Sequence, residues 1–456
     1  MDITKIVKAQ RKFFESGKTL SVAFRKEALI SLEKAIKNHE QEVISALKED
    51  LGKSLQESYM CEYGLALSEL TYMKKHFKGY ARRKRATSPL TNFPSASYLY
   101  KVPYGNVLIM SPWNYPFLLT IDPLIDAIAA GNTAVVKPSA YSPKTGAVMQ
   151  KIISEAFDPE YVAMILGGRQ ENQTLLDEKF DFIFFTGSQA VGKEVMAKAS
   201  KHLTPVSLEL GGKSPCIIDE DANIKLAAKR VVFGKYLNCG QTCVAPDYIV
   251  CHKNIKNAFI EAVKEEIKKQ YGDDPLNNDA YGKIINDKHF NRIVGLIDEK
   301  KLVYGGKSDS SKLKIEPTVI DNVSYDDAIM QQEIFGPLMP ILSFDNLDEL
   351  LDNINKGPHP LAFYYFSKNS AKAKAAVVRC RFGGGCINDT IVHLATPYMP
   401  FGGVGESGMG NYHGKFGFNT FSHTKSIVNK KQWLDLNMRY QPYTDGKVKI
   451  LKMFLK

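Results

Sequence analysis

The feature of this sequence that most constrains its fold is a repeated alternation of short apolar runs with amphipathic stretches. Apolar runs of strand length occur at residues 106–110, 134–136, 161–166 and 182–185, and helical stretches follow at 144–157 and 189–199. Strand, helix and strand at this spacing favour parallel βαβ units. We therefore expect an α/β fold that begins with a doubly wound, Rossmann-like sheet of the kind that binds nucleotides.

A second alternation begins after the glycine pair 211–212. It predicts strands at 216–218 and 248–251 and helices at 224–237 and 258–270. A chain of 456 residues is too long for one compact core. We therefore expect a second α/β domain beside the first.

The composition bears on location and partners. Seven cysteines, spread from Cys61 to Cys386, are an odd number and favour a reducing compartment. No secretory h-region is found in the first 18 residues and no apolar stretch is long enough to span a bilayer, so a cytoplasmic protein is expected. The net charge is +11, but basic residues alternate with acidic ones and no recognition motif accompanies them. We expect no nucleic-acid partner.

A glycine-containing turn follows the apolar run at 182–185. Gly187 and Gly192 stand where a strand passes into a helix, and the N-terminus of a helix favours a phosphate group. The spacing nearly matches a P-loop, but the Ser or Thr that would bind magnesium is replaced by Glu194, so a P-loop NTPase is rejected. A phosphate contact and a simple tight turn both remain open.

The hexapeptide 238–243 holds two cysteines, Cys239 and Cys243, at helical spacing. A buried cysteine most often acts as an inert small apolar residue. A zinc site with Cys251 and His252 lacks the usual C-x-x-C pairing. A third interpretation is a nucleophile, since the polar Gly-Gln-Thr context suits an accessible loop.

Two other segments support chemistry at a thiol. Glu209 stands between leucines before the glycine pair, and an apolar environment should raise the pKa of its carboxyl towards the range of a general base. A buried salt bridge to a lysine is the alternative. Asn114 lies between two prolines after an expected strand, where a rigid amide either donates to an oxyanion or caps a turn.

Taken together, these segments resemble the aldehyde dehydrogenase superfamily, and within it the class 3-like branch. The resemblance runs from about Phe24 to Ser426. It rests on eight motifs in the expected order, at residues 112–116, 131–133, 137–139, 185–188, 208–213, 240–243, 333–337 and 400–403. Any one of them could occur by chance, whereas eight in order are highly specific.

The resemblance implies roles for individual residues. Cys243 is the nucleophile, Glu209 the general base and Asn114 the side-chain oxyanion donor, with the backbone N–H of Cys243 as second donor. The thiolate adds to an aldehyde, hydride passes to a nicotinamide cofactor, and water activated by Glu209 hydrolyses the thioester to a carboxylate. No metal is required for this chemistry.

The resemblance also implies a cofactor site for NAD, NADP or both. Lys137 and Glu333 would hold the two riboses, Phe335 would pack near the nicotinamide ribose, and residues 187–192 would face the pyrophosphate. The cofactor residues that the motifs contribute are Trp113, Lys137, Ser139, Thr186, Gly187, Ser188, Gly192, Glu333 and Phe335. Tyr115 and His413 are expected in the substrate pocket, although a lone histidine more often has a structural role.

A family member of this kind has a cofactor domain, a catalytic domain and a small strand arm that pairs with a second subunit, so a homodimer is expected. We assign residues 1–82 and 104–209 to the NAD(P)-binding domain, 210–397 to the catalytic domain, 83–103 and 398–430 to the arm, and 431–456 to a C-terminal tail. Strands at 98–102 and 419–428 are the candidates for the arm.

Three departures from the family pattern matter. Ala140 stands where many relatives carry a glutamate that binds the adenosine ribose, which predicts that NADP is accepted. Cys239 is either a filler or the partner of Cys243 in a protective disulfide. The tail 447–456 alternates basic and apolar residues, so it is a dimer contact, a disordered tail or a weak contact with a membrane surface.

Two other functions compete with hydrolytic aldehyde oxidation. In a CoA-acylating dehydrogenase, coenzyme A replaces water in the thioester step, but Glu209 argues against it because a thiol acceptor needs no base to activate water. A non-enzymatic protein that binds anions or membranes through its positive charge is disfavoured by the presence of Cys243, Glu209 and Asn114 together.

Overall fold

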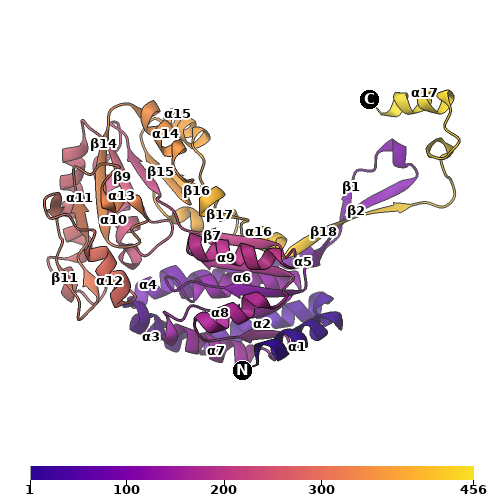
Figure 1. The fold of residues 1–456 in the computed structure, drawn as a ribbon, viewed down its shortest axis with the longest axis horizontal. Coiled ribbons are helices and arrows are strands. Elements are labelled where there is room, and N and C mark those ends of the chain that lie inside the picture. The colour runs from indigo at the N-terminus through magenta and orange to yellow at the C-terminus, as the bar shows by residue number, and fades with distance from the viewer. Residues whose placement is uncertain (1, 456) are drawn as a thin grey trace.

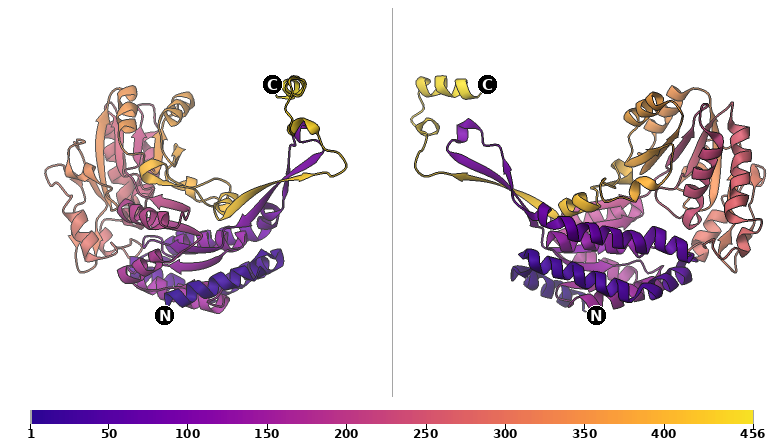
Figure 2. Two further views of the ribbon diagram at one scale, coloured as in Figure 1. Left: turned by 45° about the vertical axis from the view of Figure 1, so that its right-hand side comes forward. Right: turned by 180° about the vertical axis from the view of Figure 1, so that it is seen from behind.

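The computed structural model describes residues 2–455 and consists of a two-domain body with a long arm (Figure 1). Each domain is built on its own mainly parallel sheet, and the arm is a three-stranded antiparallel ribbon that extends away from the body (Figures 1 and 2). This is the α/β architecture expected from the alternating sequence pattern.

The first sheet has six strands in the order β17-β7-β6-β3-β4-β5. Their bounds are β3 Asn106–Met110, β4 Thr133–Lys137, β5 Val162–Met164, β6 Phe182–Gly187, β7 Val206–Leu210 and β17 Gly408–Met409. All neighbours are parallel except β17, which pairs antiparallel with β7. The central strands are wholly buried, because helices cover both faces of a parallel sheet.

Helices surround this first sheet, and the N-terminal ones lie along its underside in Figure 1. They are α1 Ile3–Glu15, α2 Val22–Asn38, α3 Glu40–Leu51, α4 Leu55–Ser58, α5 Gly64–Ala81, α6 Leu118–Ala130, α7 Pro143–Ala156, α8 Arg169–Asp177 and α9 Gln189–Ser200. A π-helical turn, η2 Tyr59–Tyr63, joins α4 to α5. The helical periodicity of the first 80 residues is thereby confirmed.

The second sheet has seven strands in the order β10-β13-β14-β9-β8-β15-β16. Their bounds are β8 Pro215–Ile218, β9 Tyr248–His252, β10 Leu302–Tyr304, β13 Thr318–Ile320, β14 Leu338–Phe344, β15 Ala362–Phe366 and β16 Gly384–Ile387. The helices are α10 Ile224–Tyr236, α11 Lys256–Tyr271, α12 Asp287–Val294, α13 Ala328–Gln331, α14 Leu347–Lys356 and α15 Ser370–Arg379, with a small hairpin β11 Ser308–Asp309 and β12 Lys314–Ile315.

The arm consists of β1 Lys84–Ala86, β2 Ser95–Pro103 and β18 Ser422–Lys430. β18 pairs antiparallel with β2 along nine residue pairs, from Ser422 opposite Pro103 to Lys430 opposite Ser95. Its other edge carries no strand in the described part of the chain. A C-terminal helix, α17 Asp445–Phe454, lies beyond the far end of the arm (Figure 2).

The structure corrects two local expectations. Residues 419–420, expected to begin a strand, end the helix α16 Gly414–Thr420, which packs against α5 and α6. The segment 398–430 therefore divides between the body and the arm, since β17 and α16 belong to the body.

No helix among residues 2–455 is long and apolar enough to cross a membrane.

Candidate active site

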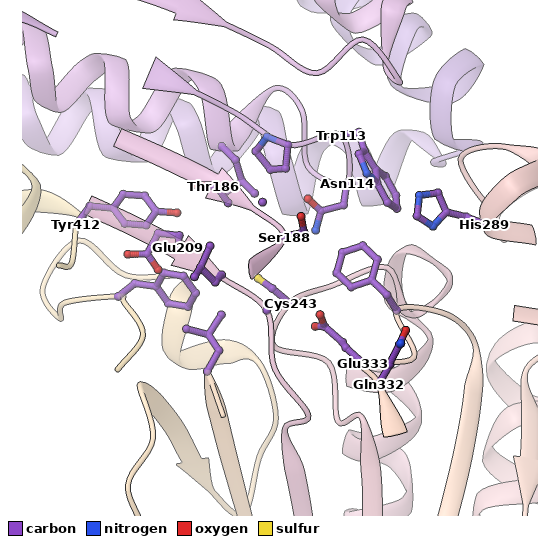
Figure 3. Close-up of a pocket in the computed structure, with 18 of the residues that line it drawn as sticks. Trp113, Asn114, Thr186, Ser188, Glu209, Cys243, His289, Gln332, Glu333 and Tyr412 are labelled. Carbon is purple, nitrogen blue, oxygen red and sulfur yellow. The ribbon is translucent and has the colours of Figure 1, made fainter. Parts of the chain in front are cut away.

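Two cavities meet at Cys243, between the first and second sheets. One opens on the carboxyl ends of the first sheet's strands and contains polar groups, and the other is an apolar tunnel. Cys243, Leu119, Phe401 and Tyr412 line both. In Figure 3 Cys243 lies between Glu209 and Glu333, with Asn114 across from it.

The loop that carries Cys243 begins with a left-handed turn. Asn238, Cys239 and Gly240 have φ values of 52°, 53° and 73°. A Cβ on Gly240 would lie 2.2 Å from the backbone oxygen of Gly336, so the turn requires glycine at this position. The spacing of the two cysteines is typical of a helix, but the left-handed turn shows that they do not lie on a regular one. Cys239 is buried in the core of the second domain, whereas Cys243 lines the cavities.

The Cys243 thiol is protonated in this environment. Burial raises its pKa to about 12, and the nearby carboxyl groups of Glu333 and Glu209 act in the same direction. A thiol of this kind becomes a nucleophile only when a base removes its proton. The thiol must therefore lose its proton as it attacks a substrate.

Glu209 places a buried carboxyl group in the same cavity as Cys243. It lies near the end of β7, it is 2% exposed, and burial raises its pKa well above the usual carboxyl value. Neither carboxyl oxygen has a hydrogen-bond partner among residues 2–455. The buried salt bridge to a lysine that we had considered is therefore not formed in the described structure. An unpartnered buried carboxyl group is costly for stability and typical of a functional site.

Asn114 lies in the loop that follows β3. Its side-chain Nδ2 donates to the backbone oxygen of Gln241 over 3.0 Å, so the amide is held against the loop of Cys243. Its neighbour Trp113 packs edge-to-face on Phe335, with ring centroids 5.3 Å apart. The two aromatic rings form one wall of the polar cavity.

The turn after β6 faces the polar cavity. Ser188 caps α9 by accepting a hydrogen bond from the N–H of Val191, and Thr186, Gly187 and Ser188 all line the polar cavity. The hydroxyl of Thr186 is buried without a partner in the described chain. Gly192, in the first turn of α9, packs against Leu210, and a Cβ there would lie 2.8 Å from that side chain.

The remaining cofactor candidates are spread along the same edge. Lys137 ends β4 and donates to the backbone oxygens of Pro138 and Gly167, both over 2.8 Å; burial lowers its pKa to about 8. Glu333 lines the cavity, where burial raises its pKa to about 8. Ser139 accepts a hydrogen bond from the N–H of Tyr141. Lys137, Ser139 and Gly192 do not line the cavity at Cys243.

The apolar tunnel is lined by Tyr115 and His413, as expected, and by many residues that sequence analysis did not single out. These are chiefly Met60, Cys61, Leu65, Leu118, Phe233, Leu237, Ile391, Val392 and Leu394. His413 is buried with Nδ1 3.7 Å from the carboxylate of Asp122, and burial lowers its pKa to about 4. It is therefore neutral at physiological pH.

Within residues 2–455 no group of three or more His, Cys, Asp or Glu side chains is arranged to hold a metal ion. Cys251 and His252 are adjacent residues of β9, so their side chains point to opposite faces of the sheet. The zinc site that we had weighed is thus not formed by these residues.

A thiol and an unpartnered carboxyl group share a cavity at the edge of a sheet of the type that binds nucleotides, an arrangement that suits an oxidoreductase. The aldehyde dehydrogenase family model matches residues 1–427. The chain belongs to the aldehyde dehydrogenase family, and it is an NAD(P)-dependent enzyme that oxidises aldehydes.

Individual relatives cover nearly the whole chain. The 4,4'-diaponeurosporen-aldehyde dehydrogenase of Staphylococcus aureus is 47% identical over 448 residues, which are 98% of this chain and 97% of that protein. The dimeric NADP-preferring aldehyde dehydrogenase of Canis lupus familiaris is 43% identical over 446 residues, 96% of this chain and 98% of that one. A substrate-bound structure of Staphylococcus aureus AldH superposes with a TM-score of 0.98 at 46% identity, with complete coverage of both chains.

Proposed function

We propose that Cys243 is the nucleophile, Glu209 the general base and Asn114 the oxyanion donor of this aldehyde dehydrogenase. The observation that carries the proposal is the position of Cys243, which lies where the polar cavity meets the apolar tunnel. An aldehyde that enters through the tunnel reaches the sulfur with its carbonyl beside Asn114. The cofactor reaches the sulfur of Cys243 from the polar cavity.

We assign the cofactor to the polar cavity and to the edge of the first sheet. The unpartnered hydroxyl of Thr186 and the glycine turn at 187–192 fit a pyrophosphate, and the carboxyl of Glu333 fits a ribose. Trp113, Ser188 and Phe335 complete this wall, while Lys137 and Ser139 serve the adenosine end. When bound, the nicotinamide accepts a hydride from the substrate carbon.

Cys243, Asn114 and Glu209 carry out the addition to the aldehyde and the hydrolysis of the thioester. The sulfur of Cys243 bonds to the aldehyde carbon as its proton leaves to solvent water, and Asn114 together with the backbone N–H of Cys243 holds the new alkoxide. When the C–O double bond re-forms, hydride leaves and a thioester remains on Cys243. Glu209 then takes a proton from water, whose oxygen attacks the thioester and releases the carboxylate and the thiol.

Hydrolysis and transfer to coenzyme A differ only in this last step. The unpartnered Glu209 favours water as the acceptor. Product analysis by mass spectrometry, with and without coenzyme A, tests the choice. We expect the carboxylic acid at the same rate in both cases, whereas an acyl-coenzyme A product would establish the alternative.

The substrate we propose is a long apolar aldehyde. Aliphatic and aromatic side chains make up nearly all of the tunnel wall, and a chain of methylene groups gains about 0.8 kcal/mol per buried CH₂ in such a site. The relative from Staphylococcus aureus is named 4,4'-diaponeurosporen-aldehyde dehydrogenase. The exposed Val392 and Met60 place the tunnel mouth at the surface.

NADP is proposed as an accepted cofactor beside NAD. Ala140 is exposed next to the lysine of the adenosine end, so no carboxylate there repels a 2′-phosphate. The relative from Canis lupus familiaris is named NADP-preferring. Binding of NADP thousands of times weaker than that of NAD would contradict this proposal.

A homodimer in the cytoplasm is the proposed state of the enzyme. The unpaired edge of β18 is available for strand pairing with a second copy, and the same relative is named dimeric. We also propose that the domain of residues 1–82 and 104–209 binds the cofactor, that the domain of residues 210–397 carries Cys243, and that residues 83–103 and 422–430 form the arm. Light scattering gives the mass in solution, and a monomer would contradict the dimer.

Weak contact with a membrane surface is proposed for α17. Its exposed apolar residues, including Ile450, Met453 and Phe454, alternate with three lysines at 447, 449 and 452. Such a helix suits a surface of anionic lipid. Flotation with anionic vesicles should carry the whole chain and release a variant that lacks residues 445–456; equal flotation would contradict the proposal.

A further inference from the structure

A fully buried ion pair lies directly behind the loop of Asn114. Lys53 and Glu62 both have 0% side-chain exposure, and the Nζ of Lys53 donates to Oε1 of Glu62 over 2.6 Å. The same ammonium donates to the backbone oxygen of Asn114 over 2.9 Å. Neither residue belongs to a motif that the sequence analysis identified.

The backbone oxygen of Asn114 also joins this loop to the loop of the nucleophile. It accepts a second hydrogen bond, over 2.8 Å, from the side-chain amide of Asn238. Asn238 begins the left-handed turn that leads to Cys243, and its own N–H donates to Glu57 over 2.9 Å. One carbonyl oxygen is therefore held by two buried donors from two different segments.

The side chain of Asn114 is oriented by the same network. One of its two amide hydrogens is directed at the backbone oxygen of Gln241, which leaves the other for an oxyanion. Gln241 is itself immobilised, because its Nε2 donates to the backbone oxygens of Asn238 and Lys283, both over 3.0 Å. The amide plane of Asn114 consequently has one orientation.

Glu62, the acidic partner of the ion pair, holds the C-terminal part of the loop that carries Asn114. Oε2 of Glu62 accepts hydrogen bonds from the backbone N–H groups of Phe117 and Leu118, over 2.8 and 3.3 Å, at the start of α6. The ammonium of Lys53 also lies 3.9 Å from the centre of the Tyr115 ring. Glu62 lies in the π-helical turn η2, a local geometry that is frequent at functional sites.

Stability alone does not account for this pair. Burying two charges costs desolvation that their attraction seldom exceeds, and an apolar pair of the same volume is often as stable. A displacement of about 1 Å in a catalytic group, by contrast, can cost about 10²-fold in rate. The contacts of the pair lead to the loop that carries Asn114.

We propose that the Lys53–Glu62 ion pair is a positioning device that fixes the Asn114 amide against the Cys243 loop. This inference rests on the proposed role of Asn114 as oxyanion donor. Lys53 and Glu62 do not touch the substrate. They act by holding both ends of the segment 114–118 and, through Asn238, the turn before the nucleophile.

The test is a double substitution that removes the charges without leaving one of them unpaired. Lys53→Met with Glu62→Gln should lower the single-turnover rate of NADH formation by about 10- to 100-fold, which does not exceed the loss of about 10² to 10³ for removal of the oxyanion donor itself. The Kd for NAD should stay unchanged. In an Asn114→Ala background the same pair of substitutions should lower the rate by less than about 3-fold, because the group that it positions is gone.

A matched control removes another lysine ion pair far from the site. Lys256 lies 2.9 Å from the carboxylate of Asp321, and Lys256→Met with Asp321→Asn should leave the single-turnover rate unchanged. Should the first double variant fail to fold, Lys53→Gln with Glu62→Gln removes both charges with polar side chains of nearly the same length. A full rate in either folded variant, or an equal loss with and without Asn114, overturns the inference. If Asn114→Ala alone retains full activity, the proposed function of Asn114 fails instead.

Discussion

The side-chain amide of Asn114 donates to the backbone oxygen of Gln241 over 3.0 Å, and this bond connects loops that extend from the two different sheets. Asn114 follows β3 of the first sheet, and Gln241 precedes Cys243, between α10 and β9 of the second. The proposed oxyanion donor and the nucleophile are therefore fixed relative to each other before a substrate binds. Such preorganisation is the main source of electrostatic stabilisation in enzymes.

Replacement of Asn114 by alanine should lower kcat by about 10² to 10³, the usual cost of one oxyanion donor. Stability should change by only about 1 kcal/mol, because the loss is one buried hydrogen bond and the oxygen of Gln241 still accepts from Asn238. Steady-state kinetics and thermal unfolding measure the two effects. Asn278→Ala is the control, since it removes an amide bonded to the carbonyl of Tyr271 elsewhere; a kcat within about 3-fold of the parent for Asn114→Ala would contradict its role.

Replacement of Glu209 by glutamine should separate the two half-reactions. The amide cannot take a proton from water, so the thioester should accumulate after hydride transfer. We expect a burst of about one reduced cofactor per active site followed by a rate at least about 10²-fold lower than that of the parent, in keeping with the usual contribution of a general base. Stopped-flow absorbance measures the burst, and intact mass spectrometry should find the acyl group on Cys243. Unimpaired turnover would remove Glu209 from the mechanism.

The pH dependence of stability should reveal the buried Glu333. Its pKa of about 8 in the folded protein lies above the ordinary value of 4.5, so the folded state holds the proton more tightly than the unfolded chain. This contribution to stability is fully present below about pH 4.5 and is lost as the pH rises through about 8. The Tm of the parent should therefore fall more than that of Glu333→Gln between pH 5 and 8.5. Parallel Tm profiles would show that Glu333 does not titrate in this window.

A charge at the tunnel mouth should act on long substrates only. Val392 is 51% exposed and lines the tunnel, so Val392→Glu should leave folding intact but place a carboxylate against an apolar chain. We expect kcat/KM to fall about 10-fold for a ten-carbon aldehyde, since losing the burial of two CH₂ groups costs about that much, and to stay unchanged for acetaldehyde. Val378→Glu, at a more exposed position outside the tunnel, is the control. An equal loss for both substrates would argue against the tunnel as the route of entry.

The sequence predicted the residues whose motifs are local. Glu209, Cys243 and Thr186 stand at strand ends or in tight loops, and the order of such short motifs carried the resemblance from which the reaction was predicted. The long apolar runs also predicted the strands well, because a strand buried on both faces tolerates few polar residues.

The residues that the sequence did not predict contact partners that are far away along the chain. Lys53 and Asn114 are 61 residues apart, and nothing in the local pattern of a lysine predicts that it is fully buried. The tunnel wall is likewise assembled from segments around residues 60, 118, 237 and 392, each of which is ordinary apolar sequence. Residues 419–420 were expected to begin a strand but end the helix α16, because packing of this helix on α5 and α6 decides their conformation rather than intrinsic propensity.

The most direct test of the central claim is absorbance at 340 nm with purified enzyme, a long apolar aldehyde, and NAD or NADP, beside a Cys243→Ser variant. We predict cofactor reduction by the parent with both cofactors and a loss of at least about 10³-fold in the variant, because a hydroxyl in this buried site is a far weaker nucleophile than a thiol. The variant should still bind cofactor. Undiminished reduction by Cys243→Ser would contradict the account, because the reaction would then proceed without the thiol on which every step depends.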